Sequence, residues 1–370
     1  MFTKPSRSRA KIGIVGGGQL AQMMVDAAGP LGVDCAVLDR AGDESVARSG
    51  GAGSVRTVER FDVPTLMAFA SEVDVITFDH EPVDLGAVIE AAERGATLRP
   101  GPAALAFSDK AHQRSALAAN SLPVPPFAVA SDPDAVDLFG SEHGWPIVVK
   151  APIGGYDGRG VTVAADLGTA MDELGRFGGR AVLEPLLPLR AELSVVTVRT
   201  IDGEVVAYPP VDTRQDQGIC HEVTAPSSLP DPILRVAATI AERVAEVVGS
   251  VGVLAVELFV VGDEVFVNEV APRPHNSGHL TIEACATSQF ENHLRAVLGW
   301  PLGSTSLVVP AAAMVNVVGP DSGQPTLTAG PGITIHDYEK SPRPGRKLGH
   351  VTAVAEDVTT AIASARSALR

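Results

Sequence analysis

Short apolar runs alternate with helical patterns over the first hundred residues. The pattern predicts strands at residues 11–15, 33–39 and 73–78. It predicts helices at residues 19–28, 63–70 and 83–94. This alternation is typical of βαβ units on a parallel sheet. It ends at Arg99-Pro100-Gly101-Pro102, because proline and glycine continue neither a helix nor a central strand. One domain therefore ends near residue 105, and a helical connector is expected through Asn120.

Strands joined by glycine loops and hairpins follow from residue 122 onward. A buried strand is predicted at 146–150, and Asp202-Gly203 between apolar runs at 194–201 and 204–208 is a strong hairpin signal. A second hairpin is predicted at 252–261 and 264–269, after an amphipathic helix at 233–248. From about Pro301 the pattern predicts strands at 311–317 and 333–338 and a helix at 358–369. The fold class is α/β, or α+β overall.

Length and composition are those of a globular enzyme with more than one domain. The 370 residues exceed the roughly 250–300 at which a single core stops growing. A net charge of -15 disfavours broad contact with nucleic acid or an anionic membrane. The three cysteines have neither disulfide-framework nor zinc-site spacing, and no apolar run approaches the ~20 residues of a membrane helix. We therefore expect a cytoplasmic protein that acts on small molecules.

The first glycine-rich turn, Gly16-Gly17-Gly18-Gln19-Leu20-Ala21, fits the dinucleotide pattern G-x-G-x-x-A. Asp39 ends the second predicted strand at about the spacing of a ribose-binding acid. Taken alone, these residues indicate a site for NAD or FAD, as in an NAD-dependent dehydrogenase. The same glycines serve any tight turn from a strand into a helix, so a phosphate site or a structural turn stays open.

A second glycine-rich loop, Gly154-Gly155-Tyr156-Asp157-Gly158-Arg159-Gly160, follows a strand that ends at Lys150. Its glycines let the main chain fold over a polyphosphate, and Lys150 and Arg159 bring positive charge to the phosphate oxygens. No Gly-Lys-Ser/Thr opens a helix, so the loop is not a Walker A motif. A plain hairpin with a solvated arginine is the alternative.

Two acids lie on the apolar strands of the second hairpin. Burying the charged carboxylates of Glu257 and Glu269 there would cost free energy unless they are paired or bound to a cation. A three-residue turn at Gly262-Asp263-Glu264 places them opposite each other, and Mg²⁺ with ATP phosphates would relieve their repulsion. A two-residue turn opposes Glu257 to Asn268 instead and weakens the metal interpretation. Edge-exposed glutamates are the structural alternative.

Two further segments are candidates for substrate binding. Residues 271–279, Ala-Pro-Arg-Pro-His-Asn-Ser-Gly-His, are dense in hydrogen-bond donors beside the two acids. Residues 340–347, Lys-Ser-Pro-Arg-Pro-Gly-Arg-Lys, gather four cations in an acidic chain. This basic stretch is either a solvated turn or a phosphate clamp.

These residues together resemble the ATP-dependent 5-(carboxyamino)imidazole ribonucleotide synthases of purine biosynthesis, within the ATP-grasp superfamily. The resemblance spans nearly the whole chain and rests on GGGQLAQM, residues 77–81, VVKAPIGGYDGRG, GVLAVELFV, NEVAPRPHNSGHLTIEACATSQFENH and HDYEKSPRPGRKLGH. It implies a Rossmann-like domain at 1–105, an ATP-grasp domain at 106–300 and a small β-rich C-terminal domain at 301–370. It also implies a homodimer, ATP, and Mg²⁺ with Mn²⁺ as a second option.

The resemblance further implies the roles of individual residues. Arg273, Lys150 and Arg159 would be catalytic, and Glu257 and Glu269 would be the metal ligands. ATP would be bound by Lys110, Lys150, Gly155, Tyr156, Asp157, Gly158, Arg159, Gly160, Glu184, Pro185, Leu186, Leu187, Glu192, Asn268 and Glu269. Aminoimidazole ribonucleotide would meet Glu81, Tyr156, Arg159, Arg273, His275, Asn276, Ser277, Lys340, Arg346 and Lys347, the last three at its phosphate.

The implied reaction uses bicarbonate and ATP to carboxylate the amine of aminoimidazole ribonucleotide. Three positions differ from the family's usual residues: Asp79 replaces Glu, Val161 replaces Gln and Gln215 replaces His. Each difference puts one contact with a ligand in question. Another ATP-grasp carboxylase or formyl-transfer ligase is the nearest alternative, followed by the dehydrogenase. A non-catalytic binding module would have to explain why so many charged side chains follow apolar strands.

Overall fold

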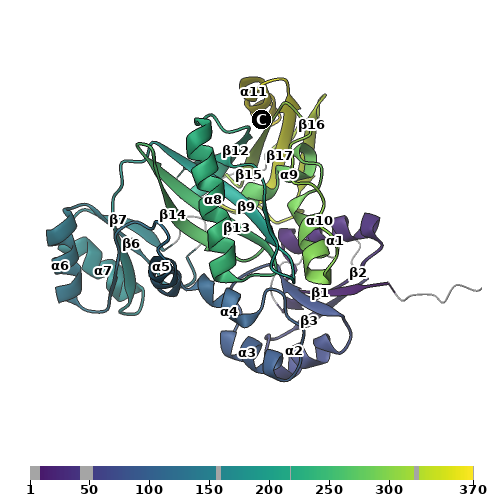
Figure 1. Cartoon of the computed structure of the whole chain (residues 1–370), viewed down its shortest axis with the longest axis horizontal. Helices are drawn as coiled ribbons and strands as arrows, with labels where there is room; N and C mark the ends of the chain where they lie inside the picture. The colour runs from purple at the N-terminus through teal and green to yellow at the C-terminus, as the bar shows by residue number, and fades with distance from the viewer. Residues whose placement is uncertain (1–8, 42–52, 156–159, 217, 321–324, 370) are drawn as a thin grey trace, which may run out of the picture.

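The computed structural model describes residues 9–41, 53–155, 160–216, 218–320 and 325–369 (Figure 1). The chain begins with a four-stranded parallel sheet in the order β3-β2-β1-β4. Its strands are β1 (Lys11–Val15), β2 (Asp34–Arg40), β3 (Ser54–Val58) and β4 (Val75–Phe78). Its helices are α1 (Gln19–Leu31), α2 (Val63–Ala70) and α3 (Leu85–Glu93). The predicted parallel sheet is confirmed, and β3 is an added edge strand whose polar, mostly exposed residues concealed it.

A helical connector leads out of this sheet, as predicted. It consists of α4 (Pro102–Leu105), η1 (Ala106–Ser108) and α5 (Lys110–Ala119). The Asp109 carboxylate caps α5 by accepting from the backbone N–H groups of Ala111 and His112. This cap fixes the start of the helix, and with it the position of Lys110.

The smaller lobe, at the left of Figure 1, is a four-stranded antiparallel sheet in the order β5-β8-β6-β7. Its strands are β5 (Ala128–Ala130), β6 (Ile147–Lys150), β7 (Val161–Ala164) and β8 (Ala181–Pro185), with helices α6 (Pro133–His143) and α7 (Leu167–Arg176). One apolar cluster within the lobe, from Ala130 to Leu183, joins the strands to both helices. The lobe therefore has its own core.

A nine-stranded sheet forms the body, in the order β14-β13-β9-β11-β12-β15-β17-β16, with β10 paired to β9. Its strands are β9 (Ala191–Arg199), β10 (Val205–Ala207), β11 (Val211–Asp216), β12 (Ile219–Ala225), β13 (Gly252–Val261), β14 (Glu264–Ala271), β15 (Ala311–Val318), β16 (Ile333–Asp337) and β17 (Lys347–Ala355). Strands on both sides of the predicted boundary at 300/301 thus share one sheet. Both predicted hairpins are present.

Five helical segments cover this sheet: α8 (Asp231–Val248), η2 (Asn276–Gly278), α9 (Thr281–Ala284), α10 (Gln289–Leu298) and α11 (Val358–Ser367). Alternation along the strands separates two faces, because successive side chains point in opposite directions. Leu193 and Val195 of β9 pack on α8, which crosses in front of the sheet in Figure 1. Glu192 and Ser194 therefore point to the opposite face.

Other expectations from the sequence can be compared with the described residues. The three cysteines are unbonded and buried, as expected for reduced thiols. None of the helices described is both long and apolar enough to span a bilayer.

Candidate functional site

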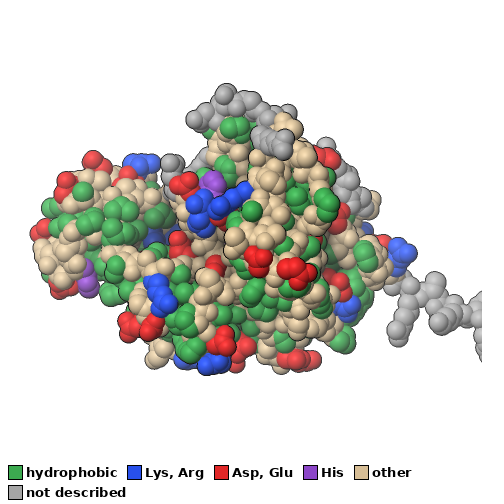
Figure 2. Space-filling view, turned by 90° about the horizontal axis from the view of Figure 1, so that it is seen from above, with side chains coloured by type: hydrophobic (Ala, Val, Ile, Leu, Met, Phe, Trp, Pro, Cys, Tyr) green, Lys and Arg blue, Asp and Glu red, His purple; other side chains and the backbone are tan. Residues whose placement is uncertain are grey.

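A cleft of about 1030 Å³ lies where the parallel sheet, the smaller lobe and the body meet. Figure 2 shows Lys and Arg side chains gathered on the face toward the viewer, near the junction of the smaller lobe with the body. The cleft walls include these residues singled out from the sequence: Glu81, Lys110, Lys150, Gly155, Glu184, Pro185, Leu186, Leu187, Glu192, Glu257, Asn268, Glu269, Arg273, His275, Asn276, Lys340, Arg346 and Lys347. One cavity thus collects residues spread over almost the whole chain.

The hairpin β13–β14 opposes Glu257 to Glu269, but not through the expected turn. Val261 pairs with Glu264, so the turn has two residues, and the three-residue turn is wrong. The register then shifts between Glu257 and Leu258, where Asn268 is an extra residue on β14. This β-bulge sets both Asn268 and Glu269 against Glu257. The Asn268 amide lies 3.5 Å from the Glu257 carboxylate.

The two opposed carboxylates titrate differently. Burial and the neighbouring charges of Glu269 and Glu192 raise the pKa of Glu257 to about 7. Burial also raises the pKa of Glu269, but the Lys110 ammonium that pairs with it, together with the charges of Lys150 and Arg114, brings the pKa below its usual value. The pair therefore holds less than two full negative charges unless a cation is close.

These residues fit a divalent cation bound together with phosphates. Within the described residues, no three His, Cys, Asp or Glu side chains form a metal-binding group on their own. Mg²⁺, however, is usually held by one or two carboxylates while phosphates and waters complete its shell. The bulge brings two carboxylates together, and the raised pKa of Glu257 marks a place that favours positive charge.

Lys150 lies in a buried ion-pair network on the floor of the cleft. Its Nζ is 2.7 Å from Glu184 Oε2 and donates to Asn268 Oδ1 at 3.1 Å. Arg114, absent from the sequence analysis, donates to the other Glu184 oxygen at 2.6 Å and to the Val267 carbonyl at 3.0 Å. Burial would raise the pKa of Glu184, but the two cations keep it below its usual value. This network joins β6, β8, α5 and β14.

An apolar wall adjoins the network. It is formed by Val148, Ile153, Val161, Val163, Pro185, Leu186, Leu187, Leu189 and Phe259. Glu192 lines the cleft beside it, and burial raises its pKa. An apolar slot with an acid at its edge suits a purine base and a ribose hydroxyl. Together with Lys110, Lys150, Glu184, Glu257 and Glu269, this wall is called the nucleotide end.

The described ends of the glycine loop lie near this end. Gly155 lines the cleft, and Gly160 closes the loop, because its carbonyl accepts from the Ala151 N–H at 2.7 Å. Gly160 has φ +74°, a conformation that favours glycine. Tyr156, Asp157, Gly158 and Arg159 lie outside the described residues.

Loops and a strand end form the opposite end of the cleft, called the acceptor end. Arg273 pairs with Glu81 at 3.0 Å, and each side chain is 21% exposed, so both remain accessible from the cleft. His275 Nε2 lies 3.6 Å from Glu257 Oε1, where this end meets the nucleotide end. Burial and the nearby charge of Arg273 hold the pKa of His275 well below its usual value. The Asn276 side chain is fixed by two reciprocal hydrogen bonds to Asn316, at 2.7 and 2.9 Å.

The basic stretch 340–347 completes the acceptor end. Lys340, Arg343, Arg346 and Lys347 all line the cleft, and Lys347 begins β17. The Lys340 ammonium donates to the side-chain carbonyl of Gln19 at the start of α1. The first and last parts of the chain therefore meet here, next to the first glycine-rich turn.

The first glycine-rich turn accommodates side chains of the protein itself. The Gly18 N–H donates to Asp79 Oδ2 at 2.6 Å, and His80 Nδ1 lies 2.7 Å from Asp79 Oδ1. A Cβ on Gly16 would lie only 2.0 Å from Asp79 Oδ1. The glycines are therefore explained by this close approach, without a dinucleotide. His80 lines the cleft and was missed in the sequence, although its place beside Glu81 was a usable signal.

The pKa of His80 lies above its usual value. Burial works against protonation of the ring, but the hydrogen bond and charge of Asp79 outweigh it. Asp39 also favours the charged form, and Arg273 opposes it. His80 thus places a titratable charge at the acceptor end.

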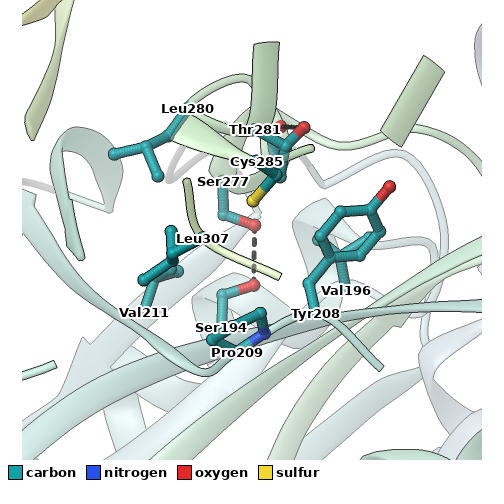
Figure 3. Close-up of a pocket in the computed structure, with 11 residues that line it drawn as sticks. Ser194, Val196, Tyr208, Pro209, Val211, Ser277, Leu280, Thr281, Cys285 and Leu307 are labelled. Atoms are coloured by element: carbon teal, nitrogen blue, oxygen red, sulfur yellow. Dashed lines mark hydrogen bonds between the residues drawn. The ribbon is translucent and has the colours of Figure 1, made fainter. Parts of the chain in front are cut away.

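Ser277 is the one described site residue, besides Gly160, that does not line the cleft. Its side chain is buried behind His275 and borders a separate small cavity of about 10 Å³ (Figure 3). The predicted direct contact of Ser277 with a substrate therefore has no support in this arrangement.

Three family descriptions match consecutive parts of the chain. Residues 9–109 match the ribonucleotide synthetase preATP-grasp domain, residues 115–290 the ATP-grasp domain, and residues 312–364 the phosphoribosylaminoimidazole carboxylase C-terminal domain. The three matches follow the order of the parallel sheet, the two ATP-grasp sheets and the C-terminal β-rich region.

Known proteins resemble the chain over nearly its whole length. An N5-carboxyaminoimidazole ribonucleotide synthase of Mycobacterium bovis is 42% identical over 364 residues, covering 94% of this chain and 84% of that protein. The synthetase of Thermotoga maritima superimposes with a TM-score of 0.86 at 35% identity, covering 98% and 99% of the two chains. The synthase of Aspergillus clavatus, solved with ADP and 5-aminoimidazole ribonucleotide, gives 0.86 at 30% identity over 96% of each chain.

Proposed function

The chain belongs to the N5-carboxyaminoimidazole ribonucleotide synthase family, and from this we propose how its cleft carries out the ATP-dependent carboxylation of 5-aminoimidazole ribonucleotide. It is an ATP-grasp carbon–nitrogen ligase of purine biosynthesis. One observation supports the proposal for the site. The nucleotide end, with its apolar slot, paired cations and opposed carboxylates, lies in the same cleft as the cations of the acceptor end.

The reaction is proposed to proceed in two steps. A bicarbonate oxygen attacks the γ-phosphorus of ATP, so that the bond to the ADP oxygen breaks and carboxyphosphate forms. The amine of the ribonucleotide then attacks the carboxyl carbon, either of carboxyphosphate or of CO₂ released from it. Phosphate leaves, the amine loses a proton, and a carbamate remains on the nitrogen.

At the nucleotide end, the chain's own residues orient ATP and balance the charge of its phosphates. Lys150 is held in place by Glu184 and Asn268, so its ammonium is preorganised for the phosphate oxygens. Lys110 exchanges its contact with Glu269 for the nucleotide. Gly155 and the loop that follows it exclude water, which would otherwise hydrolyse the intermediate. Bound Mg²⁺ would supply charge neutralisation at the transferred phosphoryl group, held by Glu257 and Glu269.

At the acceptor end, Arg273 steadies bicarbonate and carboxyphosphate, because a planar guanidinium matches two oxygens at once. Glu81 keeps the arginine in place from the opposite wall. Lys340, Arg346 and Lys347 bind the phosphate of the ribonucleotide at the mouth formed with α1. The His275 ring lies between the two ends, because its Nε2 is 3.6 Å from Glu257 Oε1.

The proposal also includes features of the whole molecule. We expect a cytoplasmic homodimer and the domain limits 1–105, 106–300 and 301–370. Analytical ultracentrifugation measures the oligomeric state, and a sedimentation coefficient of a monomer at all concentrations would contradict the dimer.

The experiment is phosphate release from Mg-ATP in bicarbonate buffer, with and without 5-aminoimidazole ribonucleotide, with carbon-13 NMR of the product. We expect release that depends on the ribonucleotide and a carbamate carbon on its amine. ATP hydrolysis indifferent to the ribonucleotide would point to another amine acceptor. Absence of ATP turnover together with NADH binding would overturn the proposal in favour of a dehydrogenase.

A further inference from the structure

Three side chains form a hydrogen-bonded row that starts in the centre of the body sheet and ends in the cleft. Ser194 Oγ lies 2.6 Å from Ser277 Oγ, and Ser277 Oγ lies 2.9 Å from His275 Nδ1. Figure 3 shows the two serine side chains pointing toward each other from β9 and η2. Ser194 is 0% and Ser277 3% exposed, so solvent does not compete for either hydroxyl. The row therefore connects a buried strand to the imidazole beside Glu257.

The backbone fixes the direction of this row. The N–H of Ser277 donates to His275 Nδ1 at 3.3 Å, and a backbone N–H can donate a hydrogen bond but cannot accept one. Nδ1 must then be an acceptor without a proton, so the neutral ring carries its proton on Nε2. The Ser277 hydroxyl can only donate to the same Nδ1. Its oxygen is left to accept from the Ser194 hydroxyl, and all donors point toward the cleft.

Ser194 is rigidly placed to begin such a row. It pairs with Glu257 of β13 on one side and with Val211 of β11 on the other, in the interior of the sheet. Its side chain and that of Glu257 leave the sheet on the same face, because they are direct cross-strand partners. The cavity beside it has room for no more than about one water molecule.

We propose that Ser194 is a positioning residue that, through the Ser277 hydroxyl, holds the ring of His275 in place, so that its Nε2–H donates to the oxyanion of the activated carboxyl unit. The role of the oxyanion rests on the function proposed above, whereas the position of the proton rests on the hydrogen bonds alone. Ser194 itself touches no substrate. A ring fixed in this tautomer is a donor from the start of the reaction and needs no reorientation.

The first test reads the proton directly by nitrogen-15 NMR of the histidine rings in the full-length protein. The His275 signals are assigned by their loss in His275→Asn. We expect a protonated Nε2 and an unprotonated Nδ1 in the unsubstituted protein. The same tautomer is expected in Ser194→Ala, because the Ser277 N–H still donates to Nδ1, but with a shifted Nδ1 signal that Ser194→Thr restores. A protonated Nδ1 in the unsubstituted protein would overturn the proposal, whether or not the protein carboxylates anything.

The second test compares turnover of matched variants. Ser194→Ala should lower kcat about tenfold, the low end for loss of a partner that orients a working side chain, with KM for ATP unchanged. Ser194→Thr keeps the hydroxyl and should restore kcat. The control is Thr197→Val, which removes another buried hydroxyl of β9, one that donates to the Leu254 carbonyl. Equal kcat in Ser194→Ala and the unsubstituted enzyme, or an equal loss in the control, would overturn the positioning role.

Discussion

The two ends of the cleft are built differently. At the nucleotide end, Lys150, Glu184 and Arg114 interlock on strands and a helix, and their side chains are at most 10% exposed. At the acceptor end, Arg273 pairs with Glu81, and each of these side chains is 21% exposed. Buried charges that satisfy one another support the fold as well as the ligand, since each would be costly alone. Charges on loops are available mainly for chemistry, so the two ends should respond differently to substitution.

The largest difference is expected in stability. Arg114→Met leaves the buried Glu184 with Lys150 alone and should destabilise the protein by about 3 kcal/mol. The thermal midpoint should fall by several degrees. The control is Arg190→Met, which breaks the exposed pair with Asp263 and should cost at most about 1 kcal/mol. Equal midpoints in the two variants would refute the structural role of the buried network.

At the acceptor end, the main expected effect of a substitution is on activity and not on stability. Arg273→Lys keeps the charge but loses the planar fork, and we expect carboxylation to fall about 100-fold. The thermal midpoint and the affinity for ATP should stay close to those of the unsubstituted protein. Unchanged turnover would remove Arg273 from the proposed role, and a large loss of stability would remove the contrast between the ends.

A smaller effect is expected from the titration of Glu257. Because its pKa is raised from 4.5 to about 7 in the folded protein, that protein keeps a proton that the unfolded chain has lost. Without metal, stability should therefore fall as the pH rises through this window. Added Mg²⁺ should raise the midpoint near pH 7.5 and much less near pH 5.5. Glu257→Gln should remove both the slope and most of the response, as thermal scans at several pH values would show.

The smallest effect is expected at His80. Its raised pKa means that its charge is complete at low pH and is lost as the pH rises through that pKa. His80→Gln should raise KM for the ribonucleotide a few-fold near pH 6.5, and the difference should vanish near pH 8.5. His143→Gln, an exposed histidine of the smaller lobe, serves as the control. A constant ratio of KM values across pH would exclude the charge as the cause.

Long elements with an unbroken pattern could be predicted from the sequence. The bounds of β1, α2 and β13 were predicted as they are found, because each element is bordered by residues that end it. β11 and β17 were missed, since polar residues interrupt their apolar alternation: Arg214 is exposed on β11, and Thr352 of β17 is buried between neighbouring strands. The β-propensity of a segment's own residues does not show which strands will pack beside it in the sheet.

Site residues that belong to a sequence motif could be predicted, whereas those brought to the site only by packing could not. The pairing of Glu257 with Glu269 was expected from a turn that the hairpin does not have, and a bulge at Asn268 produced it. No local signal distinguishes the two registers, because apolar residues alternate in either. Arg114 and Ser194 carry no motif of their own, and only the three-dimensional contacts reveal them.

The continuous body sheet determines which part of the molecule can act as a gate. Glu257 and Lys347 lie on strands of this sheet, and one apolar cluster, including Phe290 and Tyr338, ties α1 to it as well. The smaller lobe has a separate core and is connected to the rest by two chain crossings and by the contacts of Lys150 and Glu184 with Asn268 and Arg114. It is therefore the natural lid, hinged near residues 120–128 and 185–191. Such a hinge would let ADP depart while the grip on the ribonucleotide stays assembled, and a fluorophore pair spanning lobe and sheet should respond to ATP but not to the ribonucleotide alone.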